Sequence, residues 1–312
     1  MFDLKQLKYF IVCAETGSIS EAARLLYTTQ PSVSKVVKAL ENEVGMELFY
    51  RLPRGIALSE KGQEFYRYAC KIVNDMNVLE QMGKRNMTRW IRISLNPSSW
   101  FARQFVEFYN AYYEENYHFQ IYTAGVRTVM ERVRDYLDDI GFIYLMEQQK
   151  EEFLYELSRN RLLFTPMQEI ESVFYPGKKN PLYNKKETSE ITLEEMKKMR
   201  FIQNYQDDFF KPGENQSEAS FSWNDLDVAV VTNSDYIMEK MLRKCNVANI
   251  SGSYLSSSKE DSTPGIPLKF EKNKVVFGYI TRKEEQLDEE TGIFIEFLQK
   301  KLKSSPNGIA EV

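Results

Sequence analysis

The sequence is poor in the residues that build metal centres and nucleophilic catalytic sites. It has three cysteines, Cys13, Cys70 and Cys245, each within an apolar helical pattern, and a single histidine, His118. Zinc sites need clustered ligands, and Ser-His or Cys-His pairs need a histidine beside the nucleophile. We therefore expect three buried free thiols, a histidine at the surface or at a strand edge, and neither a metal site nor catalytic residues.

Long uncharged apolar runs are also missing. No window approaches the roughly 18 apolar residues that a membrane-spanning helix needs. Residues 1–5 lack the basic stretch, apolar core and cleavage site of an export signal. A Walker loop and a GxGxxG turn are absent from the sequence as well. We expect a cytoplasmic protein with no membrane partner, no cofactor and no enzymatic activity.

Charge is distributed unevenly along the 312 residues. Residues 1–90 hold 13 basic and 10 acidic side chains, a net charge of +3, whereas the remainder hold 28 and 35, a net charge of −7. A purely electrostatic DNA-binding protein carries a larger positive excess in its binding domain. Any interaction with nucleic acid must therefore follow from the positions of the charges. The length itself predicts one small domain and a larger one, or three small units.

Two short helices are predicted at the N-terminus. Apolar residues recur at helical spacing over residues 4–15. Ser18 and Glu21 have the spacing of a capping box, in which the Ser18 hydroxyl and the Glu21 carboxylate each accept from a free backbone N–H. A second helix therefore begins after Ser18 and continues to about residue 26, with Leu25 and Leu26 in the core.

A third helix is predicted over residues 30–44, with Thr29 as its N-cap. Its valines gather on one face, and mostly polar and basic residues occupy the opposite face and the N-terminal turns. These positions are Gln30, Pro31, Ser32, Ser34, Lys35 and Lys38. A recognition helix points its N-terminal turns into the major groove, where Gln and Lys bond base edges. Any amphipathic helix has a polar face, but three short helices in this order favour DNA binding.

A hairpin is predicted directly after the third helix. Residues 48–50 and 56–58 read as two short strands, and residues 53–55 form the turn between them. Such a hairpin is a wing, and it places Arg51 and Arg54 where they can contact backbone phosphate or enter a minor groove. The first sixty residues are therefore expected to form a winged helix-turn-helix.

The N-terminal region carries a long series of specifically spaced residues. They run Ala22-Ala23, Leu26, Gln30-Pro31, Ser34, Leu40-Glu41, Gly45, Leu48-Phe49, Arg51, Arg54-Gly55, Leu58-Ser59 and Gly62. Over residues 1–62 this series resembles the DNA-binding domain of LysR-type transcriptional regulators. The resemblance implies that Gln30, Pro31, Ser34, Lys35 and Arg54 lie at DNA. Two residues depart from the family pattern: Ser59 replaces the usual Thr, and Lys35 replaces the usual Arg, whose bidentate fork a lysine lacks.

A long helix is predicted after the hairpin, from Ser59 as N-cap to about residue 84. It contains a heptad seam formed by Phe65, Ala69, Ile72, Met76, Leu79 and Gly83. Such a helix can pack on its own protein, but after a DNA-binding unit we expect it to pair with a second copy of the chain. The LysR-type resemblance implies the same dimer, or a dimer of dimers, which presents two recognition helices to a dyad operator in double-stranded DNA.

Strands and helices alternate after residue 90. Strands are expected over residues 90–95, 119–123, 140–145, 173–175, 201–203, 226–231 and 275–280, which predicts α/β units with parallel sheets. This layout is similar to the effector-binding domain of LysR-type regulators, in which two subdomains resemble a periplasmic binding protein. We expect a winged helix-turn-helix over 1–58, a linker helix over 59–89, an effector-binding domain over 90–303 and a tail over 304–312. Subdomain I would comprise 90–165 and 271–303, and subdomain II 166–270.

Ligands of open α/β sheets bind beyond the C-terminal ends of strands, near helix N-termini. The candidates for an effector site at such positions are Ser98, Ser99, Thr123, Arg127, Thr128, Asn204 and Asn233. For each hydroxyl alone, helix capping is the simpler role, and Arg103 and Arg127 can be ordinary surface residues. Convergence at one sheet edge favours a site for a small organic molecule, more readily an anion.

The sequence supports three functions to different degrees. The leading hypothesis is a DNA-binding transcriptional regulator that responds to a small-molecule effector, with RNA polymerase as a further partner if it is an activator. The second is an enzyme tethered by its N-terminal unit, which the missing catalytic motifs disfavour. The third is a solute-binding protein fused to a dimerisation module, which leaves the third-helix residues Lys35 and Lys38 unexplained.

Overall fold

The chain divides into two compact units. The computed structural model describes residues 2–82, 89–112, 117–183, 191–204, 226–252, 265–268, 274–283 and 285–304. Unit 1 comprises residues 1–89 and 134–137, and unit 2 comprises residues 90–133 and 138–312. In the described part of the chain, no helix is long and apolar enough to cross a membrane.

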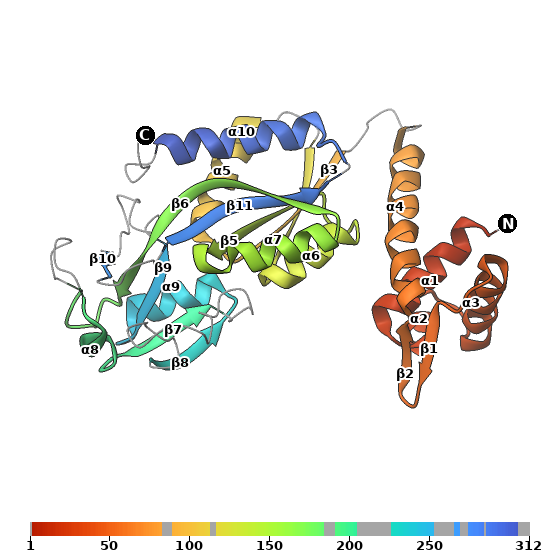
Figure 1. Cartoon of the computed structure of the whole chain (residues 1–312), viewed down its shortest axis with the longest axis horizontal. Coiled ribbons are helices and arrows are strands. Elements are labelled where there is room, and N and C mark those ends of the chain that lie inside the picture. The colour runs from red at the N-terminus through yellow and green to blue at the C-terminus, as the bar shows by residue number, and fades with distance from the viewer. Residues whose placement is uncertain are drawn as a thin grey trace. The chain divides into compact units, whose positions relative to one another are not determined.

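Unit 1 is a small helical domain with one hairpin (Figure 1). Its elements are α1 (Leu4–Thr16), α2 (Ile19–Leu25), α3 (Gln30–Val44), β1 (Phe49–Leu52), β2 (Gly55–Leu58) and α4 (Glu60–Met82). The three expected helices and both strands of the hairpin are confirmed. Gly17 and Gly45 end α1 and α3 in the left-handed conformation, which glycine adopts without steric cost.

The N-terminal caps differ from the expectation. Ser18 caps α2 by accepting from the Glu21 N–H, but the Glu21 carboxylate pairs with Arg24 one turn further along the helix. The predicted capping box is therefore only half formed. A complete box instead begins α1, where Asp3 and Gln6 each accept from the other's backbone N–H. Leu25 and Leu26 were both expected in the core: Leu26 packs partly against it, whereas Leu25, the last residue of α2, is 50% exposed.

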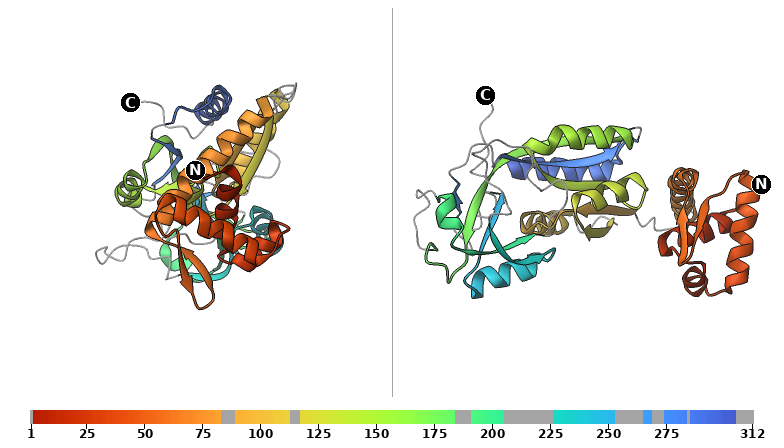
Figure 2. Two further views of the ribbon diagram at one scale, coloured as in Figure 1. Left: turned by 90° about the vertical axis from the view of Figure 1, so that its right-hand side faces the viewer. Right: turned by 60° about the horizontal axis from the view of Figure 1, so that its bottom comes forward.

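The hairpin folds tightly onto the helices, and two glycines permit this. Gly55 has φ +103°, and a Cβ there would lie 2.4 Å from the Gly17 carbonyl oxygen. A Cβ on Gly62, in α4, would lie 2.0 Å from the Leu48 carbonyl oxygen. Both approaches are shorter than any real Cβ contact, so the hairpin and α4 require glycine here. Figure 2 shows the hairpin protruding from the helices of this unit.

Helix α4 packs its N-terminal half against α1. Ala69 is 1% exposed, and Phe65 is half-buried against the Phe10 ring, with centroids 5.2 Å apart. Ala69 therefore belongs to the core of its own unit, which corrects its assignment to an intermolecular seam, whereas the seam position of Phe65 stays a prediction. Ile72, Met76 and Leu79 are exposed. Gly83 lies outside the described residues.

Unit 2 is built on a mixed sheet covered by helices. Its elements are β3 (Arg89–Leu95), α5 (Ser99–Tyr112), β4 (Tyr117–Thr123), α6 (Val126–Arg134), β5 (Ile140–Met146), η1 (Glu147–Gln149), α7 (Lys150–Arg159), β6 (Leu162–Pro176), α8 (Leu193–Met196), β7 (Arg200–Asn204), β8 (Asp227–Thr232), α9 (Asp235–Lys244), β9 (Ala248–Gly252), β10 (Ile266–Pro267), β11 (Lys274–Arg282) and α10 (Glu289–Ser304). The strand order is β4-β3-β5-β11-β6-β9-β7-β8, with β10 paired to β6.

Strand β6 joins the two halves of this sheet. Its first part pairs with β11, from Leu162 to Glu171, and its last part pairs with β9, from Ser172 to Pro176. Figure 1 shows β6 as one long band that runs through both halves. The sequence indicated only residues 173–175 as a strand, because polar residues interrupt the alternation earlier in β6. Helix α7 and strand β9 were not predicted.

Two apolar layers cover the first half of the sheet. Helices α5 and α10 pack on one face, over Phe142 and Phe277, and helices α6 and α7 pack on the other face, over Ile143 and Val276 (Figure 1). Neighbouring residues of a strand point to opposite faces, and in β5 and β11 both faces are covered. The fully apolar sequence of β5 follows from this burial.

The cysteines and the histidine occupy structural positions. Cys13 and Cys70 are buried, and burial raises the pKa of Cys13 to about 11 and that of Cys70 to about 12. Cys245 is only half-buried, which corrects the expectation of three buried thiols. His118 is exposed and stacks on Trp90, as expected for a histidine at a strand edge. Among the described residues, no group of three His, Cys, Asp or Glu side chains could hold a metal ion.

Candidate nucleic-acid interface

Helix α3 presents one buried face and one open face. Val33, Val37 and Leu40 are buried in the core of unit 1. The residues expected at DNA are exposed, except for Ser34, which is half-buried: Gln30, Pro31, Ser32, Ser34, Lys35 and Lys38. The helix therefore shows donors and positive charge on the side that does not pack.

The first turn of α3 has free backbone donors. Thr29 is its N-cap residue, but no side chain of the described residues caps the helix start. The Thr29 hydroxyl instead lies 2.9 Å from the Ser32 hydroxyl. Uncapped N–H groups and the positive end of the helix dipole suit an anion such as a phosphate. This end of α3 is thus chemically suited to the edge of a DNA groove.

Glu41 links α3 to the hairpin. Its Oε1 accepts from the backbone N–H of Leu48 at 2.9 Å and from that of Phe49 at 3.2 Å. The Ser59 hydroxyl donates to the Glu47 carbonyl at 2.7 Å and accepts from the Gly62 N–H at 2.9 Å. Both ends of the hairpin are therefore tied to helices. The sequence contained Glu41 within a motif but gave no reason to assign it this contact.

The hairpin carries its arginines at the surface. Arg51 lies in β1 opposite Ile56, and Arg54 lies in the turn between Leu52 and Gly55. Both arginines are exposed. In the part of the chain that the structure describes, no acidic side chain pairs with them, or with Lys35 and Lys38. Their charges are available to an external anion.

The first group of effector candidates lies at the C-terminal ends of β3 and β4. Ser98 is buried, caps α5 by accepting from the Phe101 N–H, and lies 2.9 Å from the Tyr144 hydroxyl. Ser99 is half-buried, and Thr123, Arg127 and Thr128 are exposed. Arg127 pairs with Glu156 at 3.2 Å. Ser98 therefore already has its hydrogen-bonding partners within the fold.

The second group of effector candidates lies in the other half of unit 2. Asn204 ends β7, and it pairs across the sheet with Thr232 at the end of the parallel strand β8. Asn233 follows Thr232, and both asparagines are exposed. The structure therefore brings the candidates together as two groups, each at the C-terminal edge of its own strands.

Asn96 directly follows β3, close to the first group of candidates, and the sequence did not single it out. Its Nδ2 donates to the Ala124 carbonyl at 3.0 Å, and its Oδ1 accepts from the Tyr144 N–H at 2.9 Å. One amide thus holds the ends of β3, β4 and β5 in fixed positions. A lone asparagine after a strand carries no sequence signal for such a bridge.

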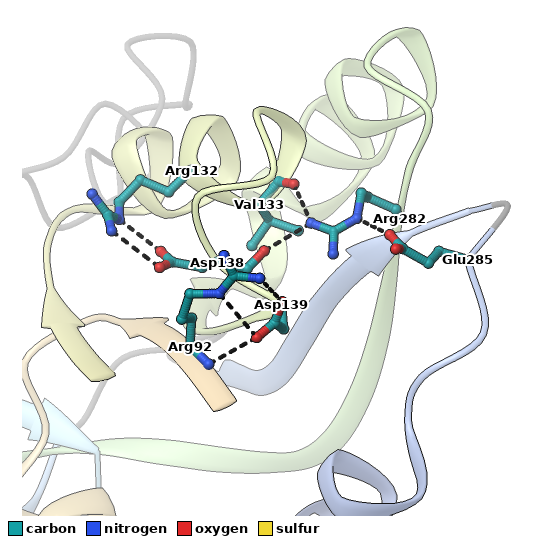
Figure 3. Close-up of polar contacts among 7 residues, drawn as sticks. All are labelled: Arg92, Arg132, Val133, Asp138, Asp139, Arg282 and Glu285. Atoms are coloured by element: carbon teal, nitrogen blue, oxygen red, sulfur yellow. Dashed lines mark hydrogen bonds and ion pairs between the residues drawn. The ribbon is translucent and has the colours of Figure 1, made fainter. Parts of the chain in front are cut away.

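Ion pairs fix the opposite edge of the same strands (Figure 3). Asp138 is fully buried and binds Arg132 of α6 at 2.6 Å, and Asp139 binds Arg92 of β3 at 2.7 Å. Arg282 of β11 donates to the Val133 and Asp138 carbonyls. Since these charges satisfy one another, the cluster is a structural support and not a binding site.

The N-terminal domain matches a known family. Residues 4–63 match the family model "Bacterial regulatory helix-turn-helix protein, lysR family". Among curated relatives, the uncharacterized HTH-type transcriptional regulator YxjO of Bacillus subtilis is 32% identical over 150 residues, which are 45% of this chain and 49% of the relative. BenM of Acinetobacter baylyi is 28% identical over 144 residues, which are 45% and 47%. The chain thus spans about half the length of these relatives.

Solved structures share the whole fold. A full-length OxyR variant from Pseudomonas aeruginosa has a TM-score of 0.58 at 14% identity, covering 99% of this chain and 100% of that one. CbnR in complex with its target DNA has a TM-score of 0.54 at 15% identity, covering 96% and 99%. The expected order of a helix-turn-helix domain followed by an α/β domain is therefore confirmed.

Proposed function

We propose that this chain is a LysR-type helix-turn-helix transcription regulator, which the match over residues 4–63 supports, and that its DNA binding responds to a small-molecule effector. The matched family model and the relative YxjO are both described as regulators, which supports a regulatory role for this chain. In this proposal residues 1–58 bind DNA, residues 59–89 pair two chains, and residues 90–303 sense the effector.

The exposed face of α3 supports the DNA-binding part of the proposal. Its N-terminal turns enter the major groove, where Gln30, Ser34 and Lys35 meet base edges. Arg51 and Arg54 extend from the hairpin to the phosphate backbone or the minor groove. The further contacts are Pro31, Ser32 and Lys38. The single observation that supports this most is that an exposed basic face lies on a helix whose other face is held in the core by Val33, Val37 and Leu40.

The exposed C-terminal half of α4 supports dimerisation. Ile72, Met76 and Leu79 lie on α4 at steps of four and three residues and are open to solvent. Pairing with a second copy would remove this apolar surface from water. The dimer would present two α3 helices to the half-sites of a dyad operator, and a dimer of dimers would extend the operator.

The effector site is proposed at the strand ends of unit 2. Ser99, Thr123, Arg127 and Thr128 would contact the ligand from one half, and Asn204 and Asn233 from the other. Ser98 would hold the turn through Tyr144. A ligand that binds both halves favours one of their relative orientations and thereby shifts the population of DNA-binding arrangements. RNA polymerase becomes a partner if the outcome is activation.

DNA binding by the purified full chain tests the proposal. We expect protection of a pseudo-palindromic segment in the DNA upstream of its own or an adjacent gene, and affinity that falls steeply with salt. Lys179→Ala, an exposed lysine of unit 2, is the control that leaves binding unchanged, whereas Lys35→Ala weakens it. A chain that binds no duplex at any salt concentration would contradict the proposal and favour the solute-binding alternative.

A further inference from the structure

Tyr27 is an aromatic residue that nothing in the fold covers. Its side chain is 98% exposed, whereas the next most exposed large apolar or aromatic residues described, Tyr155 and Tyr236, are 67% exposed. It lies in the turn between α2 and α3. Tyrosine rings are normally at least partly packed, because exposing the ring forfeits the stabilisation from its burial.

The backbone also disfavours a tyrosine at this position. Tyr27 has φ +51°, in the left-handed region that glycine and asparagine adopt most easily. The turn is held by hydrogen bonds from the Tyr27 N–H to the Arg24 carbonyl at 3.3 Å and from the Thr28 N–H to the Ala23 carbonyl at 2.9 Å. Neither packing nor backbone conformation therefore accounts for a tyrosine, and an external contact would.

The place of Tyr27 in the turn indicates what it contacts. Gln30 begins α3 only three residues later, and that end of α3 has uncapped N–H groups. In a helix-turn-helix the first helix crosses the DNA backbone and the second enters the major groove, so the turn that joins them lies close to the sugar-phosphate chain. Tyrosine hydroxyls are common donors to phosphate oxygens. Because the Tyr27 side chain is almost fully exposed, it is accessible to an external phosphate in this conformation.

We propose that Tyr27 is a DNA-positioning residue whose hydroxyl donates a hydrogen bond to a backbone phosphate beside the major groove. This inference rests on the proposed function and adds a contact to it. The contact is independent of base sequence, and it sets how deeply the N-terminal turns of α3 sit in the groove.

The test compares wild type with Tyr27→Phe, which removes only the hydroxyl. Binding of the full chain to a short mixed-sequence duplex is measured by fluorescence anisotropy over a series of salt concentrations. We expect the affinity to fall about three- to tenfold, the effect of losing one hydrogen bond. The slope of log affinity against log salt stays unchanged, because a phenol is not a cation and releases no counterion. Tyr155→Phe, on α7, is the matched control that changes neither quantity.

A second variant separates contact from folding. Tyr27→Asn suits the left-handed backbone, so we expect it to melt at or above the wild-type temperature and still lose the same affinity as Tyr27→Phe. Equal duplex affinities for wild type and Tyr27→Phe would overturn the inference, and so would a flattened salt slope. A wild-type chain that binds no duplex at all would instead overturn the proposed function on which the inference depends.

Discussion

Glu41 and Leu48 are joined by a hydrogen bond in which the Leu48 backbone N–H donates to Glu41 Oε1 at 2.9 Å. Glu41 lies in the last turn of α3, and Leu48 lies directly before β1. The same carboxylate oxygen accepts from Phe49. The helix proposed to read bases and the hairpin proposed to contact the backbone are therefore fixed relative to each other by one side chain.

Replacing Glu41 should loosen the hairpin. Glu41→Ala leaves two partly buried N–H groups without an acceptor, which costs about 1–3 kcal/mol of unfolding free energy. Glu41→Gln retains an oxygen that can accept from both N–H groups, so it should recover most of the stability and the DNA affinity. Urea unfolding of the three proteins checks this. Equal losses in both variants would show that the charge, and not the hydrogen bonds, stabilises the hairpin.

Placing a charge in the exposed stripe of α4 should dissociate the dimer. Ile72→Asp with Met76→Asp puts unpaired carboxylates into an apolar interface, and their desolvation favours separated chains. The control is Gln63→Asp, at an exposed polar position of the same helix. Sedimentation velocity measures the outcome. An intact dimer of the double variant would mean that Ile72 and Met76 do not form the interface.

The helices show how far patterns along the chain could predict this fold. Val33, Val37 and Leu40 of α3 were placed correctly because their period is local and strong. The same reasoning assigned Ala69 to a seam between chains, and it was wrong because a heptad pattern does not indicate whether its apolar face packs on its own domain or on a second chain. For Ser98, the sequence could not reveal the partner Tyr144, which lies 46 residues away.

Strand β6 shows a different limit of prediction from the sequence. Its 15 residues include an exposed leucine, Leu163, and a mid-strand proline, Pro166, so the apolar–polar alternation is irregular and only the buried end reads as a strand. The effector candidates share a topological rule, beyond the ends of parallel strands, and the structure places them there in two groups. Which of these candidates contact a ligand depends on how the two halves of unit 2 close on each other. The residue pattern contains no information on that closure.

Removal of the Ser99 hydroxyl should reduce stabilisation by an effector. A ligand stabilises the state that it binds by RT ln(1 + [L]/Kd), so a ligand that raises the melting temperature of wild type should raise that of Ser99→Ala less. Ser158→Ala, at an exposed serine of α7, is the control. Thermal-shift screening with small organic anions provides the ligand. Equal shifts in wild type and Ser99→Ala would place the site elsewhere.

The central claim is that α3 reads the base sequence whereas the hairpin contacts the DNA backbone. Paired binding isotherms test this claim most directly. Lys35→Ala, Ser34→Ala and Arg54→Ala are each titrated with the protected operator and with a mixed-sequence duplex over a range of salt. The α3 variants should lose about 1–3 kcal/mol on the operator and relax the preference at one base pair. Arg54→Ala should weaken both duplexes equally and flatten the salt slope. Unchanged operator affinity and an unchanged footprint for both α3 variants would contradict the account, because α3 would then not read the DNA.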